Sequence, residues 1–316
     1  MIPTTLLRAG AFRAAGLLRS RVPDRMRRFK TRYDPEEIWL QETWGLRAYR
    51  GTIPKWVPFA KTDFTGRFVV HFLMREIPVE ALEQVLKDNE LVLDRQPGQK
   101  THPVFLLLGH QQGVRQILWP NGVAMDYLES IIAIPKVRLA GCADGYCGPF
   151  NFATRIDANE LSPVLLGRIV GYPKHLSWIQ SSTTAFNITQ LGTSSSILSA
   201  RFAPSGDRVR ALELPAAAPA LSMLRYPVFS RSLVSPQIFT YFDWQLDEAW
   251  SSGQQVSATV VVSKDLAGLP AQTYEWGPGQ ANALSYRLSV PWQLCGPFSR
   301  EIITSPIPPF TPKWGG

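Results

Sequence analysis

The sequence predicts a domain of the α+β class, mostly antiparallel β, with a few short helices. Two observations lead to this class. Many segments are rich in β-branched and aromatic residues, whereas only two have apolar residues at helical spacing. Hydrophobic residues make up 45% of the chain, enough to fill a large core. We therefore expect an α+β or nearly all-β domain whose sheet closes, or half closes, into a barrel.

The first half of this domain alternates predicted strands with one helix. The segment 67–74, "RFVVHFLM", has strand composition, and a helix is predicted from Pro78, a residue suited to the first turn. Two further strands are predicted over 102–109 and 127–139. Pro135 indicates an edge or a bulge in the second of them, because proline cannot donate a hydrogen bond to a neighbouring strand.

A second helix is predicted over 157–171, "DANELSPVLLGRIVG". Asp157 is placed to cap its first turn, and Glu160 follows three residues later, as in a capping box. Gly171 suits a left-handed helix end. The apolar residues expected on one buried face are Leu161, Val164, Leu165 and Ile169.

The rest of the domain is predicted to be strands and connections. The strand candidates are 176–188, 194–203, 237–245, 254–264 and 282–290. We expect three regions along the chain: a basic extension and arm over 1–64, one domain over 65–295 and a proline-rich tail over 296–316.

The positive charge of the chain is confined to its beginning. Nine of the 33 basic residues and one of the 25 acidic residues lie within 1–33, which leaves 24 of each in the remainder. A neutral body predicts no binding of nucleic acid, which depends on clustered Lys and Arg. The arginine-rich leader fits an amphipathic helix packed on its own domain or on a neighbouring subunit, an organellar transit peptide, or a segment bound to an anionic membrane surface.

Membrane insertion and disulfide bonding are not predicted. No apolar run approaches the ~18 residues needed to span a bilayer. The three cysteines, Cys142, Cys147 and Cys295, are an odd and sparse set, typical of a reducing compartment. We therefore expect a cytoplasmic protein, or an organellar one if the leader is a transit peptide.

Common catalytic motifs are absent from the sequence. The four histidines are scattered, without an HExxH pair, and there is no paired CxxC, so no metal site is predicted. The sequence has no GxGxxG, P-loop or GxSxG motif, and no cofactor is predicted. The remaining candidate is Lys174 in "GYPKHLSW", a residue type that is usually exposed to solvent.

Several motifs together resemble acetoacetate decarboxylase and its relatives. "GRIVGYPKHL" is similar to the segment in which Gly-Arg precedes an aromatic-Pro-Lys, and "YLESIIAIP" is similar to the Tyr-x-Glu segment of that family. "DEAW", "KDLAGLP" and "ALSYRLSVP" follow in the family's order. The resemblance covers about 65–292 and implies a β-cone or barrel, homo-oligomers, and a small keto acid as substrate without a cofactor.

The resemblance also implies roles for individual residues. Lys174 is the amine that forms a Schiff base, and Glu129 is the carboxylate beside it. The supporting residues are Arg67, Tyr127, Tyr172 and His175. His175 stands where the family commonly has a second lysine, and Ile169 stands where it has a glutamate. A further glutamate of the family is missing from 104–112, "VFLLLGHQQ".

Imine chemistry requires a neutral amine, and a free lysine is almost fully charged at pH 7. Acetoacetate decarboxylase is itself a known case of lysine activation by desolvation or by a neighbouring cation. Here we expect desolvation by Tyr172, Leu176 and Trp178, with His175 as the neighbouring cation. The predicted function is decarboxylation of a β-keto acid. The alternatives are an aldolase or dehydratase that uses the same imine, and a protein that binds a hydrophobic ligand without turnover.

Overall fold

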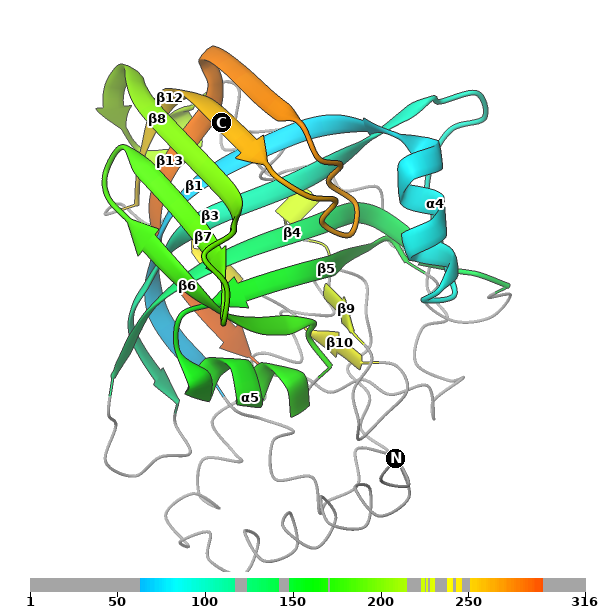
Figure 1. Cartoon of the computed structure of the whole chain (residues 1–316), viewed down its shortest axis with the longest axis horizontal. Coiled ribbons are helices and arrows are strands. Elements are labelled where there is room, and N and C mark those ends of the chain that lie inside the picture. Colours follow the sequence, from blue (N-terminus) through cyan, green and yellow to red (C-terminus); the bar gives the residue numbers. More distant parts are fainter. Residues whose placement is uncertain are drawn as a thin grey trace, which may run out of the picture.

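The computed structural model describes most of the predicted domain (Figure 1). The described residues are 63–116, 124–141, 148–169, 171–214, 223–224, 226, 228–230, 238–240, 243–245 and 251–291. The predicted extension, except for its last two residues, and the proline-rich tail lie outside them, as do the three cysteines and "DEAW". Within the described residues, no helix is long and apolar enough to cross a membrane.

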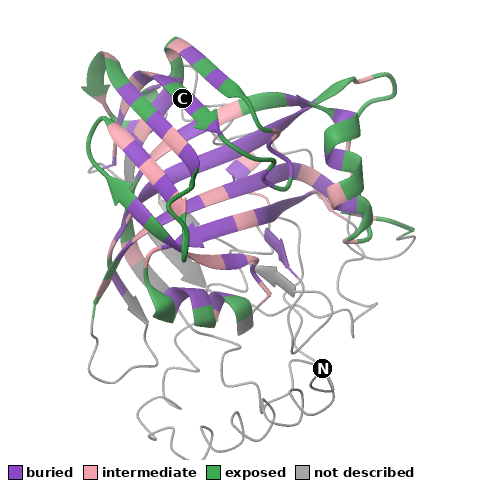
Figure 2. Ribbon diagram, in the orientation of Figure 1, coloured by how far each residue is buried: buried purple, intermediate pink, exposed green. Residues whose placement is uncertain are grey.

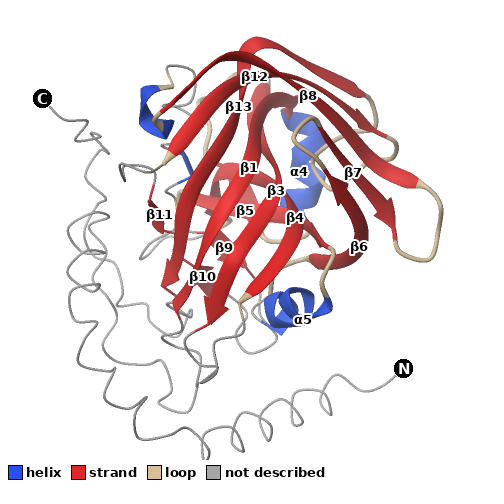
Figure 3. Cartoon of the chain, turned by 90° about the vertical axis from the view of Figure 1, so that its left-hand side faces the viewer, coloured by secondary structure: helices blue, strands red, loops and turns tan. Residues whose placement is uncertain are grey.

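The strands form one sheet that closes on itself. Its order runs β5-β6-β7-β8-β12-β13-β1-β3-β4, and β4 pairs in turn with β5 (Figures 1 and 3). The ring strands are β1 Asp63–Pro78, β3 Thr101–Gln116, β4 Met125–Leu139, β5 Phe150–Ala158, β6 Lys174–Ser181, β7 Ala185–Gln190, β8 Ser196–Val209, β12 Ser252–Val262 and β13 Thr273–Pro291. Their pairings are antiparallel except for β5 with β6.

The remaining described elements are short. They are β2 Leu91–Leu93, β9 Val228–Ser230, β10 Ile238–Thr240, β11 Asp243–Gln245, α4 Val79–Lys87, α5 Leu161–Ile169 and a 3-10 turn at Ala211–Glu213. With two short α-helices among many strands in the described part of the chain, the predicted α+β, mostly antiparallel class and the closed barrel are confirmed.

Many residues of the ring strands are buried (Figure 2), and their apolar side chains form clusters on both faces of the sheet. The larger cluster receives residues from every ring strand, as expected for the interior of a closed sheet, and α4 adds Leu82 and Leu86. A second cluster contains Phe68, Phe105 and Ile156 from the opposite face of β1, β3 and β5. That opposite face is the outer face of the barrel.

The first predicted helix is confirmed and the second is shifted. α4 begins directly after Pro78, as expected. α5 begins at Leu161, not at 157, because Asp157 belongs to β5 and pairs with β4. Gly171 has a φ of 91°, as predicted for the end of this helix. The predicted buried face of α5 is confirmed at Val164 and wrong at Leu161 and Leu165.

The exposure of the α5 side chains gives the reason. Leu161 and Leu165 are 54% and 51% exposed, whereas Val164 is 1% exposed. Pro163 and Gly167 are also buried, so α5 contacts the sheet through its small residues (Figure 2). The apolar pattern alone pointed to the larger leucines.

Three strand predictions also change. The single strand expected over 237–245 contains two strands, β10 and β11, which pair with β9 and β13 respectively. β5 was not predicted, because Asp157 near its end, together with Glu160 beyond it, was interpreted as a helix start. The single strand expected over 176–188 is the hairpin β6–β7, whose turn is held by the N–H of Ala185, a donor to Ser182 Oγ at 3.0 Å. The irregularity predicted at Pro135 is confirmed by a register shift between β4 and β5 at that point.

Candidate active site

Lys174 and Glu129 meet in a buried ion pair. The Lys174 Nζ donates to Glu129 Oε1 at 2.5 Å, and the side chains are 11% and 5% exposed. Lys174 is the first residue of β6 and pairs with Ile156 of β5. Glu129 lies in β4, opposite Ala158 of β5. β5 therefore lies between the strands that carry the two groups.

Strand alternation brings two more polar groups to this pair. Tyr127 and Glu129 are two residues apart on β4 and so lie on one face, and Gln111 of β3 is the register partner of Tyr127. The Gln111 amide donates to Glu129 Oε2 at 3.4 Å. The Lys174 Nζ lies over the Tyr127 ring, 5.6 Å from its centroid. Both oxygens of the carboxylate therefore have a donor.

The Tyr127 phenol is kept neutral by its surroundings. Burial raises the pKa of Tyr127 well above its ordinary value, and the charge of Glu129 raises it further. The phenol stays protonated at neutral pH. It can therefore act as a hydrogen-bond donor to a substrate oxygen, whereas it cannot act as a base.

α5 and the turn after it hold the backbone of Lys174. The Arg168 Nε donates to the Lys174 carbonyl at 2.6 Å, and the Tyr172 N–H donates to the Gly167 carbonyl at 2.9 Å. On the other side of the chain, the Ile156 N–H donates to the Pro173 carbonyl at 3.1 Å. The start of β6 is thus fixed between α5 and β5.

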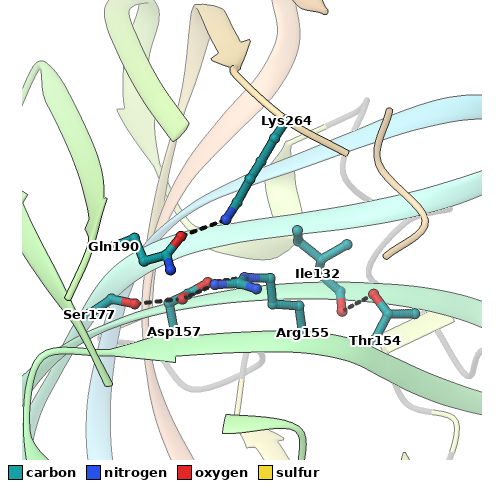
Figure 4. Close-up of polar contacts among 7 residues, drawn as sticks. All are labelled: Ile132, Thr154, Arg155, Asp157, Ser177, Gln190 and Lys264. Atoms are coloured by element: carbon teal, nitrogen blue, oxygen red, sulfur yellow. Dashed lines mark hydrogen bonds and ion pairs between the residues drawn. The ribbon is translucent and has the colours of Figure 1, made fainter. Parts of the chain in front are cut away.

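The inner face of the same strands carries a separate polar cluster (Figure 4). The Asp157 carboxylate accepts from Arg155 Nε and Nη2 at 2.7 Å each, and from Ser177 Oγ at 2.7 Å. Asp157 is 1% exposed. Because Ser177 belongs to β6, this carboxylate joins β5 to the strand that begins with Lys174.

His175 lies with this cluster and not with Lys174. Neighbouring residues of a strand point to opposite faces, so His175 shares the face of Ser177. Burial lowers the pKa of His175, and the Arg155 charge lowers it further, while Asp157 raises it. The imidazole is therefore neutral at pH 7.

The structure brings only part of the predicted site together. Lys174, Glu129 and Tyr127 meet, whereas Arg67 is exposed on β1, opposite Gln112 of β3. Tyr172 is buried in the outer cluster. Of the apolar residues expected around the amine, Leu176 is half-buried and packs near α5.

Trp178, also expected to shield the amine, is 65% exposed. Sequence reasoning missed Gln111 and Gly167, both of which lie close to the ion pair. The only signal for Gln111 was its place in "VFLLLGHQQ", where a family glutamate was expected. Among the described residues, no three His, Cys, Asp or Glu side chains are grouped so that they could hold a metal ion.

The solved structures similar to this fold include acetoacetate decarboxylases and enzymes that resemble them. The acetoacetate decarboxylase of Legionella pneumophila is 14% identical, with a TM-score of 0.46, over 78% of this chain and 92% of that one. The acetoacetate decarboxylase-like enzyme of Sphingomonas wittichii RW1 is 12% identical, with a TM-score of 0.47, over 78% and 97%. The enduracididine biosynthesis enzyme MppR is 13% identical, with a TM-score of 0.47, over 76% and 89%. No protein-family model matches the sequence, and no curated protein matches it.

Proposed function

We propose that the protein is a lyase that decarboxylates a β-keto acid through an imine on Lys174. The observation that supports this proposal is the contact between Lys174 Nζ and Glu129 Oε1, buried at the outer face of the sheet. A buried lysine beside a carboxylate combines a nucleophile with a group that accepts and returns its protons.

Imine formation requires that the ammonium first lose a proton. Glu129 is hydrogen-bonded to Nζ and can accept that proton, which leaves a neutral amine. The amine attacks the ketone carbon, a C–N bond forms, and the former ketone oxygen becomes a hydroxyl. Protonation by the Glu129 carboxylic acid lets this hydroxyl leave as water, and a protonated imine remains.

Decarboxylation then uses the imine as an electron sink. The bond between the α-carbon and the carboxylate breaks, carbon dioxide leaves, and the electron pair moves through the α-carbon to the nitrogen, which gives a neutral enamine. A proton from solvent water, delivered directly or relayed by the Glu129 carboxylate, is added to the α-carbon, and addition of water to the new imine releases the ketone and restores Lys174. No cofactor is needed for these steps.

The neighbours of the pair have supporting roles in this scheme. Gln111 holds the second carboxylate oxygen, so that Oε1 stays directed at Nζ. The protonated Tyr127 phenol is available to the carbinolamine oxygen or to the substrate carboxylate. The burial of both charged side chains limits access of bulk water to the imine.

The test is carbon dioxide release from a panel of β-keto acids that begins with acetoacetate. We expect release by the wild type, none above background by Lys174→Ala, and a rate about 10²–10⁴-fold lower for Glu129→Gln. Lys87→Ala, at an exposed lysine of α4, is the matched control and should keep the wild-type rate. Release by Lys174→Ala at the wild-type rate would overturn the proposal.

The same panel separates the two alternative functions. An imine-forming aldolase or dehydratase would give a borohydride-stable adduct without releasing carbon dioxide. Its product would come from aldol coupling or from the release or uptake of water. Saturable ligand binding that yields no adduct would identify a binding protein.

We further infer, from the resemblance and the composition, a homo-oligomer located in the cytoplasm, or in an organelle if the arginine-rich leader directs it there. Light scattering of the purified full chain tests the oligomer. Fractionation of cells that express the chain with and without residues 1–33 tests the location.

A further inference from the structure

Gly167 of α5 lies directly against the methylene stem of Lys174. A Cβ built on Gly167 would lie 2.7 Å from Lys174 Cε and 3.0 Å from Cγ, and closer still to Cδ. These are the three nearest heavy atoms, so a side chain at 167 would compete first with Lys174. The helix therefore covers the lysine at Gly167, and glycine is the one residue type that leaves room there for the lysine stem.

The stem cannot simply move aside. Its Nζ is held by Glu129, and the carbonyl of the same residue is held by Arg168, the next residue of α5. Carbon atoms in contact lie about 3.5–4.0 Å apart, so a methyl group at 167 requires the stem to shift by about 1 Å. A shift of that size at a reacting group costs about 100-fold in rate.

We propose that Gly167 is a positioning residue for the Lys174 amine. Its missing side chain lets α5 lie on the lysine stem, which keeps the amine out of water and sets Nζ beside Glu129. Glycine is the least favourable residue in a helix interior apart from proline, so local helix stability does not account for its presence here. As far as the imine is concerned, this inference rests on the proposed function.

The first test measures the amine with two reagents. With acetoacetate and cyanoborohydride, we expect Gly167→Ala to form the Lys174 adduct about 100-fold more slowly than the wild type. With acetic anhydride at a series of pH values, we expect the pH dependence of Lys174 acetylation to differ between Gly167→Ala and the wild type. Ser162→Ala, at an exposed position of the same helix, is the control and should match the wild type in both.

The second test is independent of any reaction. Alanine favours helix more than glycine does, so Gly167→Ala should raise the unfolding midpoint in a Lys174→Ala background, where the stem is absent. In the wild-type background, where Glu129 holds the end of the stem, it should lower the midpoint, and in a Lys174→Met background, which keeps a stem without that bond, the change should lie between the other two. Non-additivity of this kind reports direct contact.

The results separate this inference from the proposed function. Failure of the wild type to form any adduct counts against the proposed function, while the acetylation profile and the unfolding cycle still decide the role of Gly167. Two results would overturn the inference. The first is that Gly167→Ala changes the unfolding midpoint equally in all three backgrounds. The second is that Gly167→Ala forms the adduct and is acetylated with the same kinetics as the wild type.

Discussion

Replacement of Glu129 by glutamine tests the energetics of the buried pair. The substitution keeps the shape of the side chain and removes its charge, so the Lys174 ammonium is left buried without a counter-charge. The two side chains are only 5% and 11% exposed, so solvent compensates little. Removal of one partner from a buried pair typically costs about 3–5 kcal/mol.

For a domain of this size, that cost corresponds to a decrease in unfolding midpoint of about 5–20 °C. The assay is urea unfolding followed by tryptophan fluorescence, with thermal unfolding as a second probe. Glu83→Gln is the matched control, because Glu83 pairs with Arg95 at 3.3 Å at the surface, where the side chains are 58% and 33% exposed. It should change stability by less than about 1 kcal/mol.

The double variant Lys174→Met with Glu129→Gln removes both charges. It should be more stable than Glu129→Gln alone, because no uncompensated charge remains buried. Two results would contradict this expectation: Glu129→Gln unfolding at the same urea concentration as Glu83→Gln, or a double variant no more stable than Glu129→Gln.

Three further predictions concern pH dependence and the inner polar cluster. His71 stacks on Phe202, and burial lowers its pKa to about 4. As the pH falls, the unfolded chain therefore binds a proton at this histidine before the folded protein does, and the free energy of unfolding should fall by up to about 3 kcal/mol between pH 6.5 and 4. His71→Phe should flatten that part of the urea-unfolding profile. Burial raises the pKa of Tyr127, so the stability gained from its neutral phenol is fully present below about pH 10 and is lost at higher pH. Tyr127→Phe should therefore reduce the loss of stability that urea unfolding measures between about pH 9 and 11. Ser177→Ala removes a hydrogen bond to the buried Asp157 carboxylate and should cost about 1.5–3 kcal/mol in urea unfolding, and an unchanged midpoint would show that this bond contributes nothing.

The elements predicted well from the sequence are those whose local signals agree with their tertiary environment. The strand around 67–74 has β-branched and aromatic residues and lies within a long strand of the ring. α4 has both a proline at its start and an amphipathic pattern, and it begins where expected. In these segments, burial and propensity favour the same structure.

The end of β5 shows why other predictions failed. Asp157 and Glu160 have the spacing of a capping box, but Asp157 is occupied by Arg155 and Ser177 across two strands. Ser177 is 20 residues away on β6, and Arg155 lies two residues before Asp157 on β5, so the helical pattern that follows Asp157 reveals neither partner. α5 buries Val164 and Gly167 for the same kind of reason, because the helix must lie close to the lysine stem.

The candidate site was partly accessible from the sequence. The motif resemblance named Lys174 and Glu129, which are 45 residues apart and meet only because β4, β5 and β6 are neighbours. Gln111 could not be assigned, because a glutamine acquires a role there only through its contact with Glu129. His175 is next to Lys174 in sequence, but strand alternation places it on the other face.

The most direct test of the proposed chemistry is peptide mapping after reduction. The wild-type protein is incubated with acetoacetate and borohydride, digested, and analysed by mass spectrometry. We predict a mass increase, equal to the reduced imine of acetoacetate or of acetone, on the peptide that contains Lys174, and none on that peptide in Lys174→Arg. An adduct on a different lysine, or no adduct with any β-keto acid of the panel, would contradict the proposal that Lys174 is the reacting amine.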